Sequence, residues 1–128
     1  MSRRRVSALL ALGLMAGCAR EGPRQFDVSG MVTFRGQPIP AGVIQFDPDI
    51  ANGYDGPQGF AQIKNGVFDT RLGGRGVRAG PHVVRVQGFD GVPANELPLG
   101  NRLFADYEIR ADVQPGVDIT IDVPALKK

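Results

Sequence analysis

From residue 26 onward, apolar and polar residues alternate in short runs, which is the pattern of strands that bury one face. The alternation is clear in residues 26–36, 81–89 and 116–124. Gly, Pro, Asn and Asp separate such runs about every ten residues, as they do in sandwiches and barrels. No stretch of this part combines apolar residues at helical spacing with a cap and without Gly or Pro. The pattern therefore predicts an all-β fold.

Further short strands are expected in residues 42–48, 59–72 and 105–113. Two of the runs have clear inner faces, formed in the first run by Val28, Gly30, Val32 and Phe34 and in the last by Val117, Ile119, Ile121 and Val123. Roughly seven strands without a helix predict a single antiparallel β-sandwich. The length of 128 residues suits one such domain.

A hairpin is predicted at Asn65-Gly66, which lies between two alternating runs. A two-residue type I′ turn needs positive φ at both central positions, and Asn-Gly meets this need best. With this turn, Ile63 is expected opposite Phe68, and Ala61 opposite Thr70.

The first 17 residues have the organisation of an export signal. Three arginines precede a mostly apolar run, residues 6–17, which is too short to span a bilayer. The run ends in Met15-Ala16-Gly17 before Cys18, the single cysteine of the chain. This end resembles the lipobox of bacterial lipoproteins, with Met15 where Leu is usual. The resemblance implies cleavage after residue 17 and lipid attachment at Cys18. An ordinary signal peptide, giving a soluble periplasmic protein, is the alternative.

Residues 18–25 read as the lipidated cysteine and a short polar tether, and residues 125–128 as a C-terminal tail. Ala19 follows the cysteine where the inner-membrane retention signal of enterobacteria has Asp. By that resemblance, the protein is expected in the cell envelope, anchored on the extracytoplasmic side to the outer membrane and facing the periplasm.

The net charge changes once the signal is removed. The whole chain carries a formal +2, but residues 18–128 hold 12 Lys and Arg against 13 Asp and Glu. A nearly neutral domain has no field that would attract nucleic acid, so no nucleic-acid partner is expected.

Three segments in the folded part carry a family resemblance: residues 30–46, the Asn65-Gly66-Val67-Phe68 hairpin and residues 79–86. Their order and spacing resemble carboxypeptidase regulatory-like (transthyretin-like) domains. The resemblance implies a transthyretin-like sandwich over residues 26–124. It also implies a domain that supports attachment or interaction and does not catalyse.

Candidate chemistry is sparse. A serine–histidine hydrolase would need Ser29 and His82, the only Ser and His after Cys18, but no nucleophile elbow surrounds Ser29. His82 is expected at the edge of the core with a satisfied nitrogen, and one His without a free thiol excludes an ordinary zinc site. No cofactor and no catalysis are expected.

Two loops and one long segment remain candidates for binding sites. Asp47, Asp49 and Asp55 could offer oxygens to Ca²⁺, but a solvated polar loop is the favoured interpretation. Residues 74–79 match a dinucleotide-binding signature, yet Gly80-Pro81 prevents the helix that it needs. The arginines of residues 71–78 could touch an anionic glycan or lipid head group; a mobile, solvated connection is favoured. Residues 88–107 are rich in apolar side chains, so they either pack on the sandwich, which is favoured, or form a contact surface.

The sequence thus predicts a non-catalytic, lipid-anchored envelope protein with a structural or protein-interaction module. A glycan-binding module is the alternative, although the chain has no Trp and only two Tyr. The identity of the partner, envelope protein or glycan, is open.

Overall fold

The computed structural model describes residues 25–125, and within them the chain is almost entirely β. The expectations for the signal peptide (residues 1–17), for Cys18 and for most of the tether and the tail lie outside the described residues. The elements of the described part are β1 (Ser29–Phe34), β2 (Gln37–Pro38), β3 (Ala41–Pro48), the 3₁₀ turn η1 (Ile50–Asn52), β4 (Gly59–Lys64), β5 (Val67–Asp69), β6 (Gly80–Phe89), β7 (Tyr107–Val113) and β8 (Ile119–Val123).

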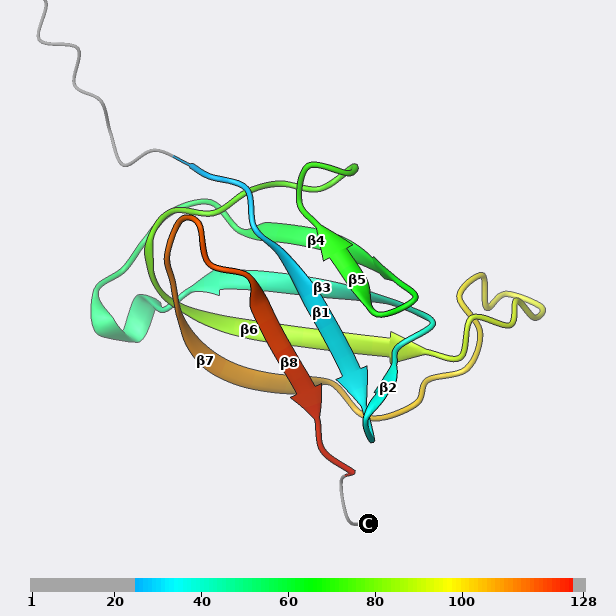
Figure 1. Ribbon diagram of the computed structural model, residues 1–128. Coiled ribbons are helices and arrows are strands. Elements are labelled where there is room, and N and C mark those ends of the chain that lie inside the picture. Colours follow the sequence, from blue (N-terminus) through cyan, green and yellow to red (C-terminus); the bar gives the residue numbers. More distant parts are fainter. Residues whose placement is uncertain (1–24, 126–128) are drawn as a thin grey trace, which may run out of the picture.

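The strands form one curled sheet in the order β2-β1-β5-β4-β3-β6-β7, with β8 paired to β1. The curl produces two layers, in which β1 and β8 cross in front of β3, β6 and β7 (Figure 1). The all-β, sandwich-like architecture confirms the predicted fold class. One ladder differs from the antiparallel expectation, because β8 runs parallel to β1. The chain crosses from one layer to the other after β7, so β8 pairs with the first strand and not with its predecessor.

The core lies between the two layers. Phe46 of β3 and Phe68 of β5 meet across it, with ring centroids 6.0 Å apart. Its buried apolar side chains come from every long strand and from three connecting segments: Val28, Val32, Ile39, Ile44, Phe46, Ala61, Ile63, Phe68, Val77, Val84, Val86, Val113, Ile121 and Val123. Val117 was expected on this inner face but is 60% exposed, because β8 begins only at Ile119.

The predicted hairpin is present. Ile63 pairs with Phe68, and Asn65 and Gly66 have φ of 49° and 78°. The ladder ends at that pair, however, so Thr70 does not pair with Ala61, and β5 turns to β1 instead.

Thr70 instead bonds to the residues that precede β1 at the start of the domain. It is buried, and its Oγ1 accepts a hydrogen bond from the Val28 amide at 3.0 Å and donates one to Asp27 at 2.9 Å. The Thr70 amide in turn donates to the Val28 carbonyl at 3.0 Å. The segment before β1 is therefore fixed to the segment after β5.

Thr70→Val is expected to destabilise the domain by about 1–3 kcal/mol, because an isosteric side chain leaves the buried Val28 amide without an acceptor. Thermal unfolding of the purified protein measures the effect. Thr120→Val is the matched control on the exposed face of β8, and its expected change is within about 0.5 kcal/mol. Equal melting temperatures for the two variants would contradict the assigned role of Thr70.

Candidate functional site

The serine and the histidine do not meet. His82 is 4% exposed and lies on the inner face of β6 with Val84 and Val86, and its Nδ1 is 2.8 Å from the Gly80 carbonyl oxygen. This confirms the expected core-edge histidine. The Ser29 hydroxyl lies on the opposite, outer side of β1 and donates to Asp118 at 3.4 Å.

Two of the three aspartates, Asp47 at the end of β3 and Asp49 just after it, are engaged within the protein. Asp49 was expected in a solvated loop but is only 3% exposed. Its carboxylate accepts a hydrogen bond from Asn52 at 2.8 Å, and the Arg110 guanidinium lies 4.0 Å away. Asp47 accepts from Gln58 at 2.6 Å. Over residues 25–125, no three His, Cys, Asp or Glu side chains gather to hold a metal ion.

The segment between β5 and β6, residues 70–79, is called the entry loop here. It was expected to be a mobile, solvated connection, but backbone hydrogen bonds fix it. Phe26 and Val77 exchange two bonds of 2.8 and 3.0 Å, and Phe60 and Arg75 exchange two of 3.0 Å. Val77 is fully buried, and β6 follows at Gly80, so no helix N-terminus exists here to hold a phosphate.

Charge and apolar surface meet on the entry loop. Leu72 is 74% exposed. The adjacent Arg71 binds Asp69 through two side-chain hydrogen bonds of 3.0 and 3.2 Å. This pairing lowers the pKa of Asp69 and raises the pKa of Arg71.

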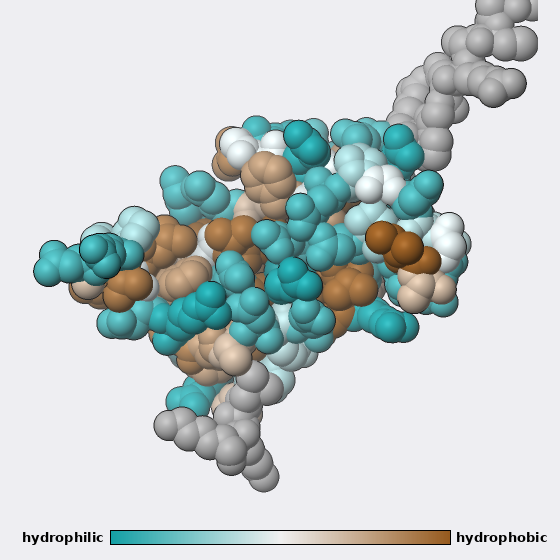
Figure 2. Space-filling view, turned by 180° about the vertical axis from the view of Figure 1, so that it is seen from behind, coloured by the Kyte–Doolittle hydropathy of each residue, from teal (hydrophilic) through white to brown (hydrophobic). Residues whose placement is uncertain are grey.

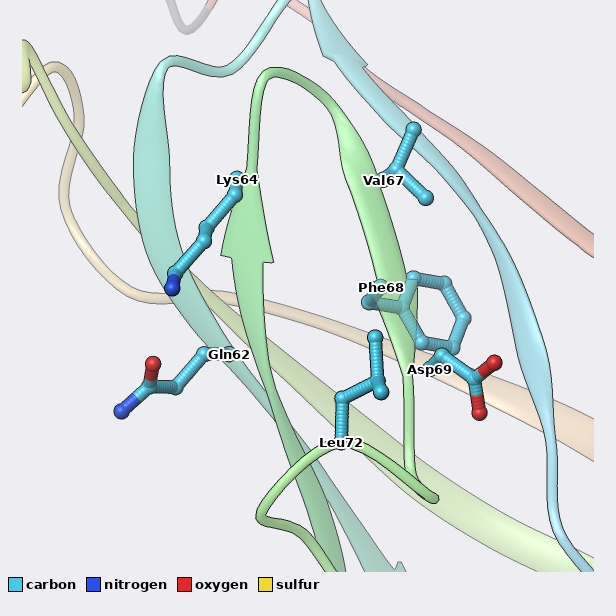
Figure 3. Close-up of a pocket in the computed structure, with 6 residues that line it drawn as sticks. All are labelled: Gln62, Lys64, Val67, Phe68, Asp69 and Leu72. Atoms are coloured by element: carbon cyan, nitrogen blue, oxygen red, sulfur yellow. The ribbon is translucent and has the colours of Figure 1, made fainter.

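A groove of about 280 Å³ runs along β5 on the outer surface. Figure 3 shows Leu72 reaching from the entry loop into the space between the two strands of the hairpin, while Gln62 and Lys64 extend from β4. The groove has an apolar floor, with the ammonium of Lys64 on one rim and the carboxylate of Asp69 on the other.

The long segment after β6 divides into two parts. Phe104 packs against Phe34 with centroids 4.9 Å apart, and the Leu103 amide donates to the Gly88 carbonyl at 3.0 Å. This part covers the sandwich, as the favoured interpretation predicted.

Residues 90–101, called the distal loop here, project from the sandwich at the end of β6 that lies away from the entry of the chain (Figure 1). In the view from behind, brown side chains lie on this projection among polar ones (Figure 2). Its exposed apolar residues are Val92, Leu97 and Leu99. The favoured interpretation of packing is therefore wrong for this part.

Internal hydrogen bonds hold the distal loop in shape. The Asp90 carboxylate accepts bonds from the amides of Val92 at 2.9 Å and Asn101 at 3.2 Å. Ala94 and Leu97 exchange two backbone bonds of 3.0 Å around a turn in which Glu96 has φ of 61°. The apolar side chains are thus displayed on a defined frame.

A hollow of about 310 Å³ lies where the distal loop joins the sandwich, lined mainly by Phe34, Pro38, Pro40 and Leu103. Arg35 stands at its side, with the guanidinium carbon 5.1 Å from the centroid of the Phe34 ring. Arg35 has φ of 52° in the turn before β2, a conformation that costs a non-glycine residue about 1–2 kcal/mol. The two-residue turn between β1 and β2, in which Gly36 has φ of 75°, requires this conformation.

Within residues 25–125 there is no helix long and apolar enough to cross a bilayer. No protein-family model, no curated protein and no solved structure matches this chain.

Proposed function

We propose that this chain is a lipid-anchored envelope protein whose carboxypeptidase regulatory-like domain is a non-catalytic module that binds another protein. The observation that carries the proposal is the distal loop, where Val92, Leu97 and Leu99 stand exposed on a frame fixed by Asp90. Exposed apolar side chains gathered on one projection are typical of contact surfaces.

The preformed shape of the distal loop supports a role in binding. A segment that is already ordered loses less conformational entropy when a partner docks. The adjacent hollow beside Phe34 and Pro40 extends the apolar surface onto the sandwich. A partner that accepts the loop can therefore also place an apolar side chain in this hollow.

The proposed absence of catalysis is supported by the placement of the candidate residues. Ser29 faces outward from β1, whereas His82 is buried in β6 and bonded to Gly80. In the groove beside β5, Lys64 and Asp69 lie on opposite rims. No proton relay follows from these contacts.

In-cell photo-crosslinking tests the proposal. With a benzophenone amino acid in place of Leu97, we expect one dominant protein adduct, because this side chain belongs to the proposed contact surface. Val117 is the matched control, since it is also apolar and exposed but lies in the turn before β8. Mass spectrometry of the adducts identifies what each position contacts.

Equal adducts from both positions, or none from position 97, would contradict a protein partner at the distal loop. Adducts that contain only glycan would favour the alternative of a glycan-binding module.

A further inference from the structure

We propose that the entry loop is a membrane-docking surface that binds anionic lipid head groups and so sets the orientation of the domain. The inference depends on the proposed lipid anchor at Cys18 and adds a second, non-covalent contact with the same membrane. Three observations support this inference: the position of the loop, the exposure of Leu72 and the distribution of charge.

The entry loop lies where the chain enters the domain. Phe26 is hydrogen-bonded to Val77, and Asp27 and Val28 are bonded to Thr70. Figure 1 shows the connection between β5 and β6 passing over the start of the described chain. Seven residues, 19–25, separate the proposed lipid attachment from Phe26, and they span at most about 25 Å when extended. The anchor therefore keeps this loop close to the membrane.

The tip of the loop is built for a partly apolar environment. Leu72 is 74% exposed, which makes it the most exposed leucine of the described part. Val67 and Met31 continue the apolar surface along β5 and β1, where they are directly paired. Side chains of this kind insert at the boundary between head groups and acyl chains.

The charge around the loop differs in sign from the rest of the domain. Residues 25–125 hold eight Lys and Arg against twelve Asp and Glu, a net charge of −4. Four of the eight basic residues, however, lie on or beside the entry loop: Lys64, Arg71, Arg75 and Arg78. Nearby acids are Asp27, Asp69 and Asp118, of which Asp69 is paired with Arg71. The surroundings of the loop thus carry about +1, whereas the rest of the described part carries about −5.

Two of these cations are available to a ligand. Lys64 and Arg75 are exposed, and no ion pair of either is found within residues 25–125. Arg75 is also held in place by its backbone bonds to Phe60. Each basic residue near an anionic bilayer raises the membrane partition coefficient about fivefold. The charge of the loop therefore complements anionic head groups, whereas the remaining surface would be repelled.

This contact would determine what the distal loop can reach. The ten residues of β6 connect the two loops and span about 33 Å. When the entry loop lies on the bilayer, β6 carries Val92 and Leu97 away from it. The docked orientation thus leaves the proposed protein-binding surface accessible.

Site-directed spin labelling of the full-length, lipidated protein tests the proposal. Because the lipid occupies Cys18, Leu72→Cys introduces the only free thiol for the label. The protein is reconstituted in vesicles of phosphatidylcholine with about one-third phosphatidylglycerol, and in pure phosphatidylcholine. Collisions with lipid-soluble oxygen and with a water-soluble nickel complex report the surroundings of the label. Val92→Cys is the control at the distal loop.

We expect the label at position 72 to be lipid-exposed on the anionic vesicles only, and the label at position 92 to stay in water on both. Arg75→Gln should lower the ratio of docked to undocked protein by about fivefold. A water-exposed label at position 72 on a protein that remains vesicle-bound would overturn the docking surface and leave the anchor intact. A protein that fails to bind vesicles and lacks lipid mass on Cys18 would overturn both.

Discussion

Replacement of Gly30 by alanine is expected to remove most of the stability of the domain, about 4 kcal/mol or more. The parallel ladder brings β1 so close to β8 that a Cβ at position 30 would overlap the carbonyl oxygen of Ile119 and approach its carbonyl carbon to 2.7 Å. Both atoms belong to backbone, which cannot rotate aside as a side chain can. The clash is relieved only if β8 separates from β1, and that exposes Ile121 and Val123.

Thermal unfolding and amide hydrogen exchange measure this effect. We expect a large loss of melting temperature and fast exchange of the β8 amides. Gly116→Ala is the matched control, because its Cβ meets nothing within 4 Å but its φ of 78° disfavours alanine. Its expected cost is about 1–2 kcal/mol, from backbone strain alone. If Gly30→Ala cost no more than Gly116→Ala, the close approach of β1 and β8 would be wrong.

Cys18→Ser is expected to abolish lipid attachment completely, since a hydroxyl does not replace the thiol as acceptor of diacylglycerol. In the lipoprotein route cleavage follows lipidation, so the variant should also retain residues 1–17. Labelled palmitate incorporation and the intact mass of the membrane fraction test both statements. Met15→Leu, which restores the usual lipobox residue, is the control and should leave processing intact.

An ordinary signal peptide has a different outcome. In that case the Cys18→Ser protein would still be cleaved and would appear as a soluble periplasmic species without lipid mass. That result would contradict the proposed anchor. It would leave the fold and the distal loop as they are described.

Much of the fold could be predicted because alternation reports directly on burial. Val28 and Val32, or Ile63 and Phe68, face the core as their spacing requires. The parallel pairing of β8 was not predictable in the same way. Alternation identifies the inner face of a strand but not its neighbour, which depends on where the chain crosses between layers.

The polar core positions were missed for a related reason. Asp49 lies next to a turn and was expected in a solvated loop, while Thr70 was expected opposite Ala61 and not beside Val28. Their burial follows from partners distant in the chain or created by the fold, such as Val28 for Thr70. Burial of a polar group is favourable only when such partners exist, and a single sequence does not reveal them.

The candidate surfaces could be predicted only as regions. Residues 88–107 were recognisable by their apolar content. Where the segment stops projecting and begins to pack on the sandwich, near residue 101, depends on Gly88, which leaves room for the Phe104 ring. For the entry loop, the arginines were visible in the sequence. Its contact with Phe26, which places it at the entry of the chain, comes from long-range pairing alone.

The pairing of β1 with β8 also sets the order in which parts of the domain can fold. Thr33 and Asp122, which share a hydrogen bond of 2.7 Å, are 89 residues apart in the chain. The first strand to emerge during synthesis also pairs with β2 and β5, but its ladder with β8 must wait for the last strand. Closing so long a loop is slow, and it comes late in folding. Until residue 123 has crossed, the core stays open along β1, and the side chains of Val32, Ile121 and Val123 remain accessible to proteases and chaperones.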